Sequence, residues 1–261
     1  MFEVGPFALR YYGLCIALGI IVATWLTGRE LERKGLDGTL ALDSLFFIVP
    51  LGFVGARAYH VIADYELYSG DPFPGVFEVW NGGLGIYGGV VGGFLGLLIF
   101  ARIRNISPWV FADAVAPGLV LAQAIGRWGN YFNQELFGRP SNLPWAIRIA
   151  QENRPVGYAD AAAFHPTFLY ESIWDVLVCL ILLWVARRFA GSLKNGDLAI
   201  LYVSLYSFGR FFVEALRVDP AFIIGGTIRG NLFVSSVLAL GFAMILLLRH
   251  SGTRRKRRRS A

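Results

Sequence analysis

Long apolar stretches separated by short polar segments dominate this chain. A helix needs about 20 mostly apolar residues to cross a membrane. Seven stretches reach or approach that length, at 11–28, 41–61, 83–101, 109–126, 168–186, 198–215 and 230–248. The pattern therefore predicts an all-α integral membrane protein with seven transmembrane helices, forming a single transmembrane domain over residues 1–261.

The positions of Lys and Arg predict which side of the membrane each end occupies. Cytoplasmic loops carry an excess of these residues. If the N-terminus lies outside, basic residues at 29–34, 102–104, 187–194 and 254–259 all fall on the cytoplasmic side. Seven spans then place the C-terminus inside. We expect residues 250–261 to form a basic cytoplasmic tail that meets anionic membrane lipids.

The longest connection, 127–167, lies between the fourth and fifth spans and would face outside. It holds Pro140, Pro144, Pro155 and Pro166 together with aromatic and charged residues. Connections this long are uncommon unless they are functional or disordered. We predict that this one is a small folded cap.

Composition excludes several classes of protein. Hydrophobic residues make up 56% of the chain, charged residues 16%, and the mean hydropathy is +0.54. The net charge of +6 is matched by the six basic residues at 254–259, so the rest of the chain is balanced. These values argue against a soluble enzyme, a disordered chain and a nucleic-acid-binding domain with a broad basic face. The sequence also has no His, Cys and carboxylate cluster with ligand spacing, so we expect no metal and no cofactor.

Charged residues inside the predicted spans point to a functional site. An ionisable residue at mid-membrane costs about 2.5–3.5 kcal/mol and is a functional candidate by default. Seven such residues lie in or at the edges of the spans: Asp43, Arg57, Asp113, Glu171, Asp175, Arg210 and Glu214. Arg210 and Glu214 are four residues apart and therefore share a helix face. Arg57, Arg127 and Arg217 lie near the outer span ends, where guanidinium groups suit an anionic lipid headgroup.

The third stretch is rich in glycine at intervals of four residues. Gly85, Gly89 and Gly93 form one row, and Gly88, Gly92 and Gly96 form a second. Such small-residue rows allow helices to pack closely. The alternative is a wall that leaves room for a lipid tail.

Residues 126–138 read GRWGNYFNQELFG and form the most specific segment of the chain. This segment resembles the signature G-R-x-G/A-N-F-x-N-x-E-x-x-G of bacterial phosphatidylglycerol–prolipoprotein diacylglyceryl transferases, with Tyr131 where Phe is usual. Residues 10–13 (RYYG), 81–89, 165–171 (HPTFLYE) and 209–217 are similar to further segments of that family. The resemblance therefore covers nearly the whole chain.

The resemblance implies a fold, a reaction and a location. The family has seven transmembrane helices, an outward N-terminus and a periplasmic cap, and it resides in the bacterial inner membrane. Its members move the diacylglyceryl group of phosphatidylglycerol to the lipobox cysteine of a preprolipoprotein, and glycerol phosphate leaves. The partners would be phosphatidylglycerol and the preprolipoprotein signal peptide.

The resemblance also implies site residues. The expected catalytic residues are Arg127, Arg210, Tyr87 and Glu135, with the arginines holding the phosphate. Tyr87 stands where many members have a histidine proposed as catalytic, and with Glu135 it is the candidate base. The expected substrate-binding residues are Tyr12, Arg57, Asn130, Asn133, His165, Glu171, Glu214 and Arg217.

Two other functions use similar features. A transporter or lipid flippase also needs buried charges and glycine-rich helices, but it is often built from an internal repeat, which we do not see here. An intramembrane protease would need a facing pair such as Asp113 and Asp175.

Overall fold

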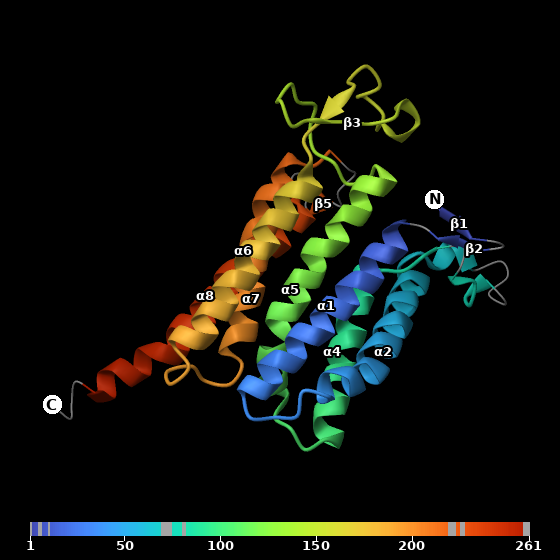
Figure 1. Ribbon diagram of the computed structural model, residues 1–261. Helices are drawn as coiled ribbons and strands as arrows, with labels where there is room; N and C mark the ends of the chain where they lie inside the picture. The colour runs from blue at the N-terminus through green and yellow to red at the C-terminus, as the bar shows by residue number, and fades with distance from the viewer. Residues whose placement is uncertain are drawn as a thin grey trace. The chain divides into compact units, whose positions relative to one another are not determined.

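The computed structural model describes residues 2–4, 7–9, 11–68, 75–79, 82–218, 223–224 and 228–257, with side chains described for residues 11–68, 75–79, 82–218 and 229–251. Among the described residues, seven helices are long and apolar enough to cross a membrane. They are α1 (Tyr11–Arg33), α2 (Leu40–Ala63), α4 (Ile86–Ile103), α5 (Pro108–Asn133), α6 (Thr167–Arg188), α7 (Asp197–Leu216) and α8 (Gly230–Arg257) (Figure 1). The prediction of an all-helical protein with seven helices able to cross a membrane is confirmed.

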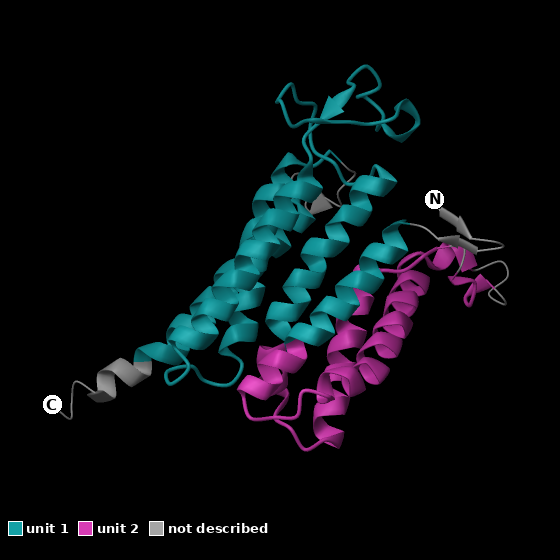
Figure 2. Ribbon diagram, viewed as in Figure 1, with its two compact units in different colours: residues 1–26, 115–261 teal, residues 27–114 magenta. Residues whose placement is uncertain are grey.

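The remaining elements are short. Within the described ranges, three antiparallel pairs of strands join β1 (Phe2–Val4) to β2 (Phe7–Leu9), β3 (Ile147–Arg148) to β4 (Ala163–Phe164), and β5 (Ile223–Ile224) to β6 (Ile228–Arg229). Two 3-10 turns, η1 (Tyr65–Tyr68) and η3 (Gln151–Asn153), lie in connections. The chain divides into two compact units, one of residues 1–26 and 115–261 and the other of residues 27–114 (Figure 2). We call them the large unit and the small unit.

Several helix ends differ from the predicted spans; helix α1, for example, ends at Arg33 and not at 28. Helix α4 begins at Ile86 and not at 83, because Gly82 and Gly83 have φ values of 93° and 78°, which a right-handed helix does not allow. Helix α5 continues to Asn133, beyond the predicted end at 126. The polar residues after 126 lower the local hydropathy, yet they leave the helical backbone intact.

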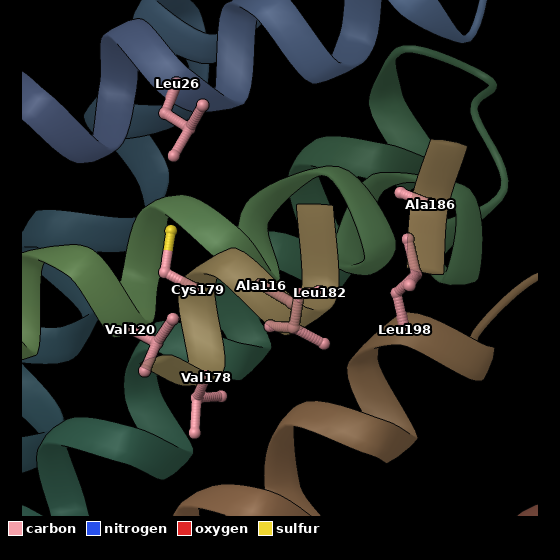
Figure 3. Close-up of a cluster of buried hydrophobic side chains, with 8 residues drawn as sticks. All are labelled: Leu26, Ala116, Val120, Val178, Cys179, Leu182, Ala186 and Leu198. Atoms are coloured by element: carbon pink, nitrogen blue, oxygen red, sulfur yellow. The ribbon is translucent and has the colours of Figure 1, made fainter. Parts of the chain in front are cut away.

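The core of the large unit joins four helices. Figure 3 shows its buried side chains, which come from α1, α5, α6 and α7: Leu26, Ala116, Val120, Val178, Cys179, Leu182, Ala186 and Leu198. Helix α6 packs on α7, and α7 packs on α8. Near one of these contacts Trp174 donates a hydrogen bond to the Leu205 carbonyl at 2.9 Å, and its ring fills the space beside Gly209. This packing fixes the mutual positions of α6 and α7.

The small unit is built on close packing of α2 against α4. A Cβ atom at Gly92 would overlap the Leu51 carbonyl oxygen, and one at Gly88 would overlap the Gly55 carbonyl oxygen. The other glycine row also meets α2, with Ala56 Cβ 3.5 Å from the Cβ position of Gly89. Helix α2 thus covers the glycine rows against which a lipid tail could have packed, and the glycines serve close helix packing.

The segment between α5 and α6 folds around its own hydrophobic core. Phe137, Ile149 and Phe164 are at most 5% exposed, and Ile147 of β3 pairs with Phe164 of β4. The segment is tied to the end of α7, because the Arg139 amide donates to the Leu216 carbonyl at 2.9 Å. It is therefore folded, whereas its position outside the membrane stays a prediction.

The predicted basic tail falls mostly outside the described side chains. The backbone of α8 continues to Arg257, whereas side chains are described only as far as Ser251. The prediction that this tail meets anionic lipids is therefore untested.

Candidate functional site

Two arginines share one carboxylate in the interior of the large unit. Arg127 Nε of α5 lies 2.5 Å from Glu171 Oε2 of α6, and Arg210 Nη1 of α7 contacts the other oxygen, Glu171 Oε1. Arg210 Nη2 also donates to Glu214 Oε2 at 2.8 Å. Glu171 is 7% exposed and Glu214 is 2% exposed. Burial at low dielectric makes these charge interactions stronger than surface ion pairs. We call Arg127, Glu171, Arg210 and Glu214 the arginine cluster.

Local sequence features place each member of the arginine cluster. Arg210 and Glu214 are neighbours on α7 because they are four positions apart. Glu171 lies in the second turn of α6, whose start is held by Thr167 Oγ1 donating to the Leu136 carbonyl. Arg127 projects from α5 before its last turn. Three helices thus converge on one carboxylate.

A further set of groups surrounds Glu214. Asn231 Nδ2 donates to Glu214 Oε1 at 3.1 Å, and Arg217 Nη1 lies 3.6 Å from Glu214 Oε2. Arg229 Nη1 donates to the Arg217 carbonyl at 3.0 Å. Glu214 therefore holds Arg210, Arg217 and Asn231 together at the end of α7.

The signature segment closes α5 with a tight polar turn. Asn130 Nδ2 and Asn133 Nδ2 donate to Glu135 Oε1 at 3.0 Å and 3.2 Å. Gln134 and Leu136 have φ values of 52° and 56°, so the chain reverses immediately after the helix. Glu135 is exposed, while Asn130 is buried. Two amides therefore fix the direction of an accessible carboxylate.

Aromatic residues of the signature pack against the start of α1. The ring of Tyr12 fills the space beside Gly129, where a Cβ atom would overlap it. Tyr11 stacks on Phe132 with ring centroids 4.8 Å apart. Trp128 Nε1 donates to Ser172 Oγ at 3.3 Å. Gly129 thus brings Tyr12 against the helix that carries Arg127.

His165 lies at the base of the folded segment. Its Nδ1 is 3.1 Å from the Tyr170 hydroxyl, which also accepts a 2.9 Å hydrogen bond from Trp145 Nε1. Its backbone exchanges hydrogen bonds with Gly138 and Arg139 at 2.9 Å and 3.0 Å. These contacts make His165 an anchor of the segment in this structure.

Arg57 and Tyr87 belong to the small unit, and the other ten predicted site residues belong to the large unit. Arg57 is 8% exposed. Its guanidinium donates hydrogen bonds to four backbone carbonyls, those of Gly75, Val76, Gly82 and Gly83, at 2.7–2.9 Å. It thus organises the connection that leads into α4. Tyr87 is 47% exposed, and its ring centroid lies 5.8 Å from that of Tyr59.

Our sequence reasoning gave no role to several polar residues beside the arginine cluster. Arg127 Nη2 donates to the Tyr206 hydroxyl at 3.0 Å, and Tyr202 donates to Gln123 Oε1 at 2.9 Å. Asp175, named above among the charged residues of the spans and as half of a possible protease pair, is 2% exposed. A spacing of four from the predicted residues would have identified them: Gln123 precedes Arg127, Asp175 follows Glu171, and Tyr206 precedes Arg210.

Within the described ranges, no group of three or more His, Cys, Asp or Glu residues is placed to hold a metal ion. The chemistry available at the site is that of guanidinium, carboxylate, amide and phenol groups. Such a set can bind an anion and move a proton.

The chain is similar to known proteins over most of its length. The family model described as "Prolipoprotein diacylglyceryl transferase" matches residues 1–248. A Frankia alni protein named "Phosphatidylglycerol–prolipoprotein diacylglyceryl transferase" is 48% identical over 250 residues, which is 94% of this chain and 64% of that protein. A Paenarthrobacter aurescens protein of the same name is 45% identical over 260 residues, covering 95% of this chain and 80% of the relative. "Phosphatidylglycerol–prolipoprotein diacylglyceryl transferase 2" of Streptomyces coelicolor is 46% identical over 257 residues, covering 96% and 80%.

Proposed function

Because this chain belongs to the prolipoprotein diacylglyceryl transferase family, we propose that it transfers the sn-1,2-diacylglyceryl group of phosphatidylglycerol to the lipobox cysteine of preprolipoproteins. The sulfur–carbon bond forms, the carbon–oxygen bond to phosphate breaks, and glycerol phosphate leaves. This is the first step of bacterial lipoprotein maturation.

The arginine cluster is the observation that carries this proposal. Two guanidinium groups, those of Arg127 and Arg210, meet at one buried carboxylate inside helices long enough to span a membrane. Guanidinium groups bind phosphate through paired hydrogen bonds, and they stabilise the charge that develops on a leaving phosphate. We assign the lipid phosphate to Arg127 and Arg210, and we assign Glu171 and Glu214 to holding these two side chains in place.

The roles of the other predicted site residues are assigned from what the reaction requires. The thiolate is the reactive form of the substrate cysteine, so a base must take the thiol proton. Tyr87 and Glu135 are our candidates for that base. Tyr12, Asn130 and Asn133 are assigned to the headgroup and glycerol backbone, whose alignment with the thiol lowers the barrier.

Besides Glu171 and Glu214, three further predicted substrate contacts take supporting roles in this proposal. Arg57 donates to backbone carbonyls, so we assign it to shaping the connection before α4. His165 anchors the folded segment between α5 and α6. Arg217 contacts Glu214 and supports the arginine cluster from the end of α7.

We further propose that the chain lies in the bacterial inner membrane with its N-terminus outside and its C-terminus inside. The segment between α5 and α6 would then be a periplasmic cap, and the basic tail would meet anionic lipids in the cytoplasm. Val156 at the fully exposed tip of the segment and exposed Ser192 between α6 and α7 allow a direct test. In intact spheroplasts, a membrane-impermeant thiol reagent should label Val156→Cys and spare Ser192→Cys. The reverse pattern would overturn this orientation.

Arginine-to-lysine variants test the phosphate clamp. Arg127→Lys and Arg210→Lys keep the positive charge but lose the paired donors. Removal of one oxyanion-binding donor typically lowers turnover about 10²–10³-fold, so we expect losses of that order. The assay incubates purified protein with phosphatidylglycerol and a lipobox peptide, and it measures the peptide mass gain of one diacylglyceryl group. Near-normal turnover by both variants would refute the clamp.

A phenylalanine at position 87 tests the base. Tyr87→Phe removes only the hydroxyl, and the exposed ring keeps its packing against Tyr59. We expect turnover to fall and its pH dependence between about pH 6 and pH 9 to change, because a general base contributes about 10²–10⁴-fold. Full turnover across that range would exclude Tyr87 as the base.

A further inference from the structure

Polar side chains continue from the arginine cluster into the space between α5, α6 and α7. We call Gln123, Asp175, Tyr202 and Tyr206 the polar seam. Tyr202 donates to Gln123 Oε1 at 2.9 Å, and Tyr206 accepts a 3.0 Å hydrogen bond from Arg127. The seam thus connects directly to the arginine cluster. Because polar groups within membrane-spanning helices are costly, the polar seam is a candidate functional feature.

Asp175 is the member of the polar seam whose hydrogen bonding is incomplete. It is 2% exposed, and its Oδ2 atom has no hydrogen-bond partner among the described residues. The charged and titratable groups that act on it are Arg127 from α5, Glu171 from α6, and Tyr202, Tyr206 and Arg210 from α7. Buried polar atoms are normally hydrogen-bonded, so an orphan oxygen indicates a proton, a water or a ligand that completes the site.

The net charge of the buried group around an ionised Asp175 becomes negative when an anion binds. Arg127, Arg210 and Arg217 contribute three positive charges, and Glu171 and Glu214 contribute two negative charges, which leaves a net +1. An ionised Asp175 would reduce this sum to zero. A phosphate diester arriving at the same two guanidinium groups would then make the buried group net negative. A net charge in this low-dielectric interior is costly, and a proton on Asp175 would restore neutrality.

We propose that Asp175 takes up one proton when a phosphate anion binds to Arg127 and Arg210, and releases it when the anion leaves. The proton comes from solvent at binding and returns to solvent at release, so the balance of the transfer reaction is unchanged. Asp175 is a positioning residue in this scheme, because it acts through the two arginines. The inference rests on the proposed phosphate clamp.

Proton uptake on binding is the measurement that tests this role. The full-length protein in detergent micelles is titrated with phosphatidylglycerol, with sn-glycerol phosphate as the water-soluble source of phosphate and with zwitterionic phosphatidylcholine as the control lipid of zero net charge. Calorimetry in two buffers of different ionisation enthalpy gives the number of protons taken up. By linkage, uptake of one proton raises the Kd about tenfold per pH unit over the pH range in which Asp175 is ionised in the free protein and protonated in the complex. Uptake with phosphatidylglycerol alone would assign the effect to the lipid headgroup.

Two variants separate Asp175 from other carboxyl groups. Asp175→Asn keeps the shape but cannot take a proton, so binding should persist without uptake and with a Kd independent of pH. Asp160→Asn, in the exposed part of the segment between α5 and α6, should keep the wild-type uptake. If Asp175→Asn does not fold, infrared difference spectra supply the test. Phosphatidylglycerol should then produce a protonated carboxyl band in the wild type that moves in Asp175→Glu.

The outcomes distinguish the two proposals. Binding without uptake in the wild type, equal uptake in Asp175→Asn, or an infrared band unmoved in Asp175→Glu would overturn the role of Asp175 and leave the clamp intact. Absence of phosphatidylglycerol binding by the wild type would overturn the clamp, and the role of Asp175 with it.

Discussion

Replacing Glu171 by glutamine removes the charge that holds the two arginines together. Glu171 Oε2 lies 2.5 Å from Arg127 Nε, and Oε1 contacts Arg210 Nη1. Glutamine has the same size, but one of its two terminal atoms is an amide nitrogen that donates hydrogen bonds. One guanidinium would therefore face a donor instead of an acceptor, and both would lose the negative charge.

The magnitude follows from the burial of this contact. The side chains of Glu171, Arg127 and Arg210 are 9%, 18% and 19% exposed, so solvent screens the interaction only weakly. Breaking a buried ion pair by removing one partner costs about 3–5 kcal/mol. For a chain of this size each kcal/mol lowers the Tm by about 2–4 °C. We therefore expect the Tm of Glu171→Gln to fall by about 6–20 °C.

The lipid gives the experiment a second readout. Glu171 competes with an incoming phosphate for the same guanidinium groups, so the loss of its charge should leave them more open to the anion. Phosphatidylglycerol should raise the Tm of Glu171→Gln by more than it raises the wild-type Tm. The matched control is Glu152→Gln, at an exposed position in η3 where surface changes stay within about 0.5 kcal/mol. A Tm of Glu171→Gln equal to that of the control would refute the bridging role.

Two glycine pairs give further predictions. Gly129→Ala should displace Tyr12 and lower both turnover and Tm, because overpacking costs about 1–3 kcal/mol. Gly126→Ala meets open space on the same helix, so its stability should be unchanged or rise by up to about 1 kcal/mol. Thermal melting with the peptide mass assay checks this pair, and equal behaviour of the two variants would contradict it. Gly92→Ala should lower the Tm through overlap with the Leu51 carbonyl oxygen, while Gly241→Ala in α8 meets open space and should not. An unchanged Tm for Gly92→Ala would mean that α2 and α4 do not depend on this close approach.

Local sequence was sufficient to predict the helices and some of the side-chain pairs. The seven spans could be predicted because the hydropathy of about 20 consecutive residues decides whether a helix can cross a membrane. The contact between Arg210 and Glu214 could be predicted because a spacing of four places both on one helix face. The same rule would have placed Asp175 beside Glu171 and Tyr206 beside Arg210. The boundary of α5 was missed because hydropathy falls at Arg127, although that side chain is partnered by Glu171 and Tyr206.

Contacts between helices could not be predicted in this way. Nothing in the spacing of Glu171 shows that it bridges Arg127 of α5 and Arg210 of α7, because the partners lie 44 and 39 positions away in the chain. The headgroup contact predicted for Arg57 stays a prediction, but its four hydrogen bonds to backbone carbonyls of the connection before α4 could not be read from the sequence. The glycine rows fitted either a lipid wall or helix packing until α2 was seen to fill them.

The sequence by itself determined the seven helices, the signature segment and the side chains available for anion chemistry, because each depends on residues close together in the chain. The tertiary structure alone decided which of these side chains meet. Guanidinium and carboxylate groups inside a membrane-spanning fold must find partners, and the packing of α5, α6 and α7 determines which partners are within reach. That packing gave Glu171 its place between two arginines and left Asp175 Oδ2 without a partner among the described residues.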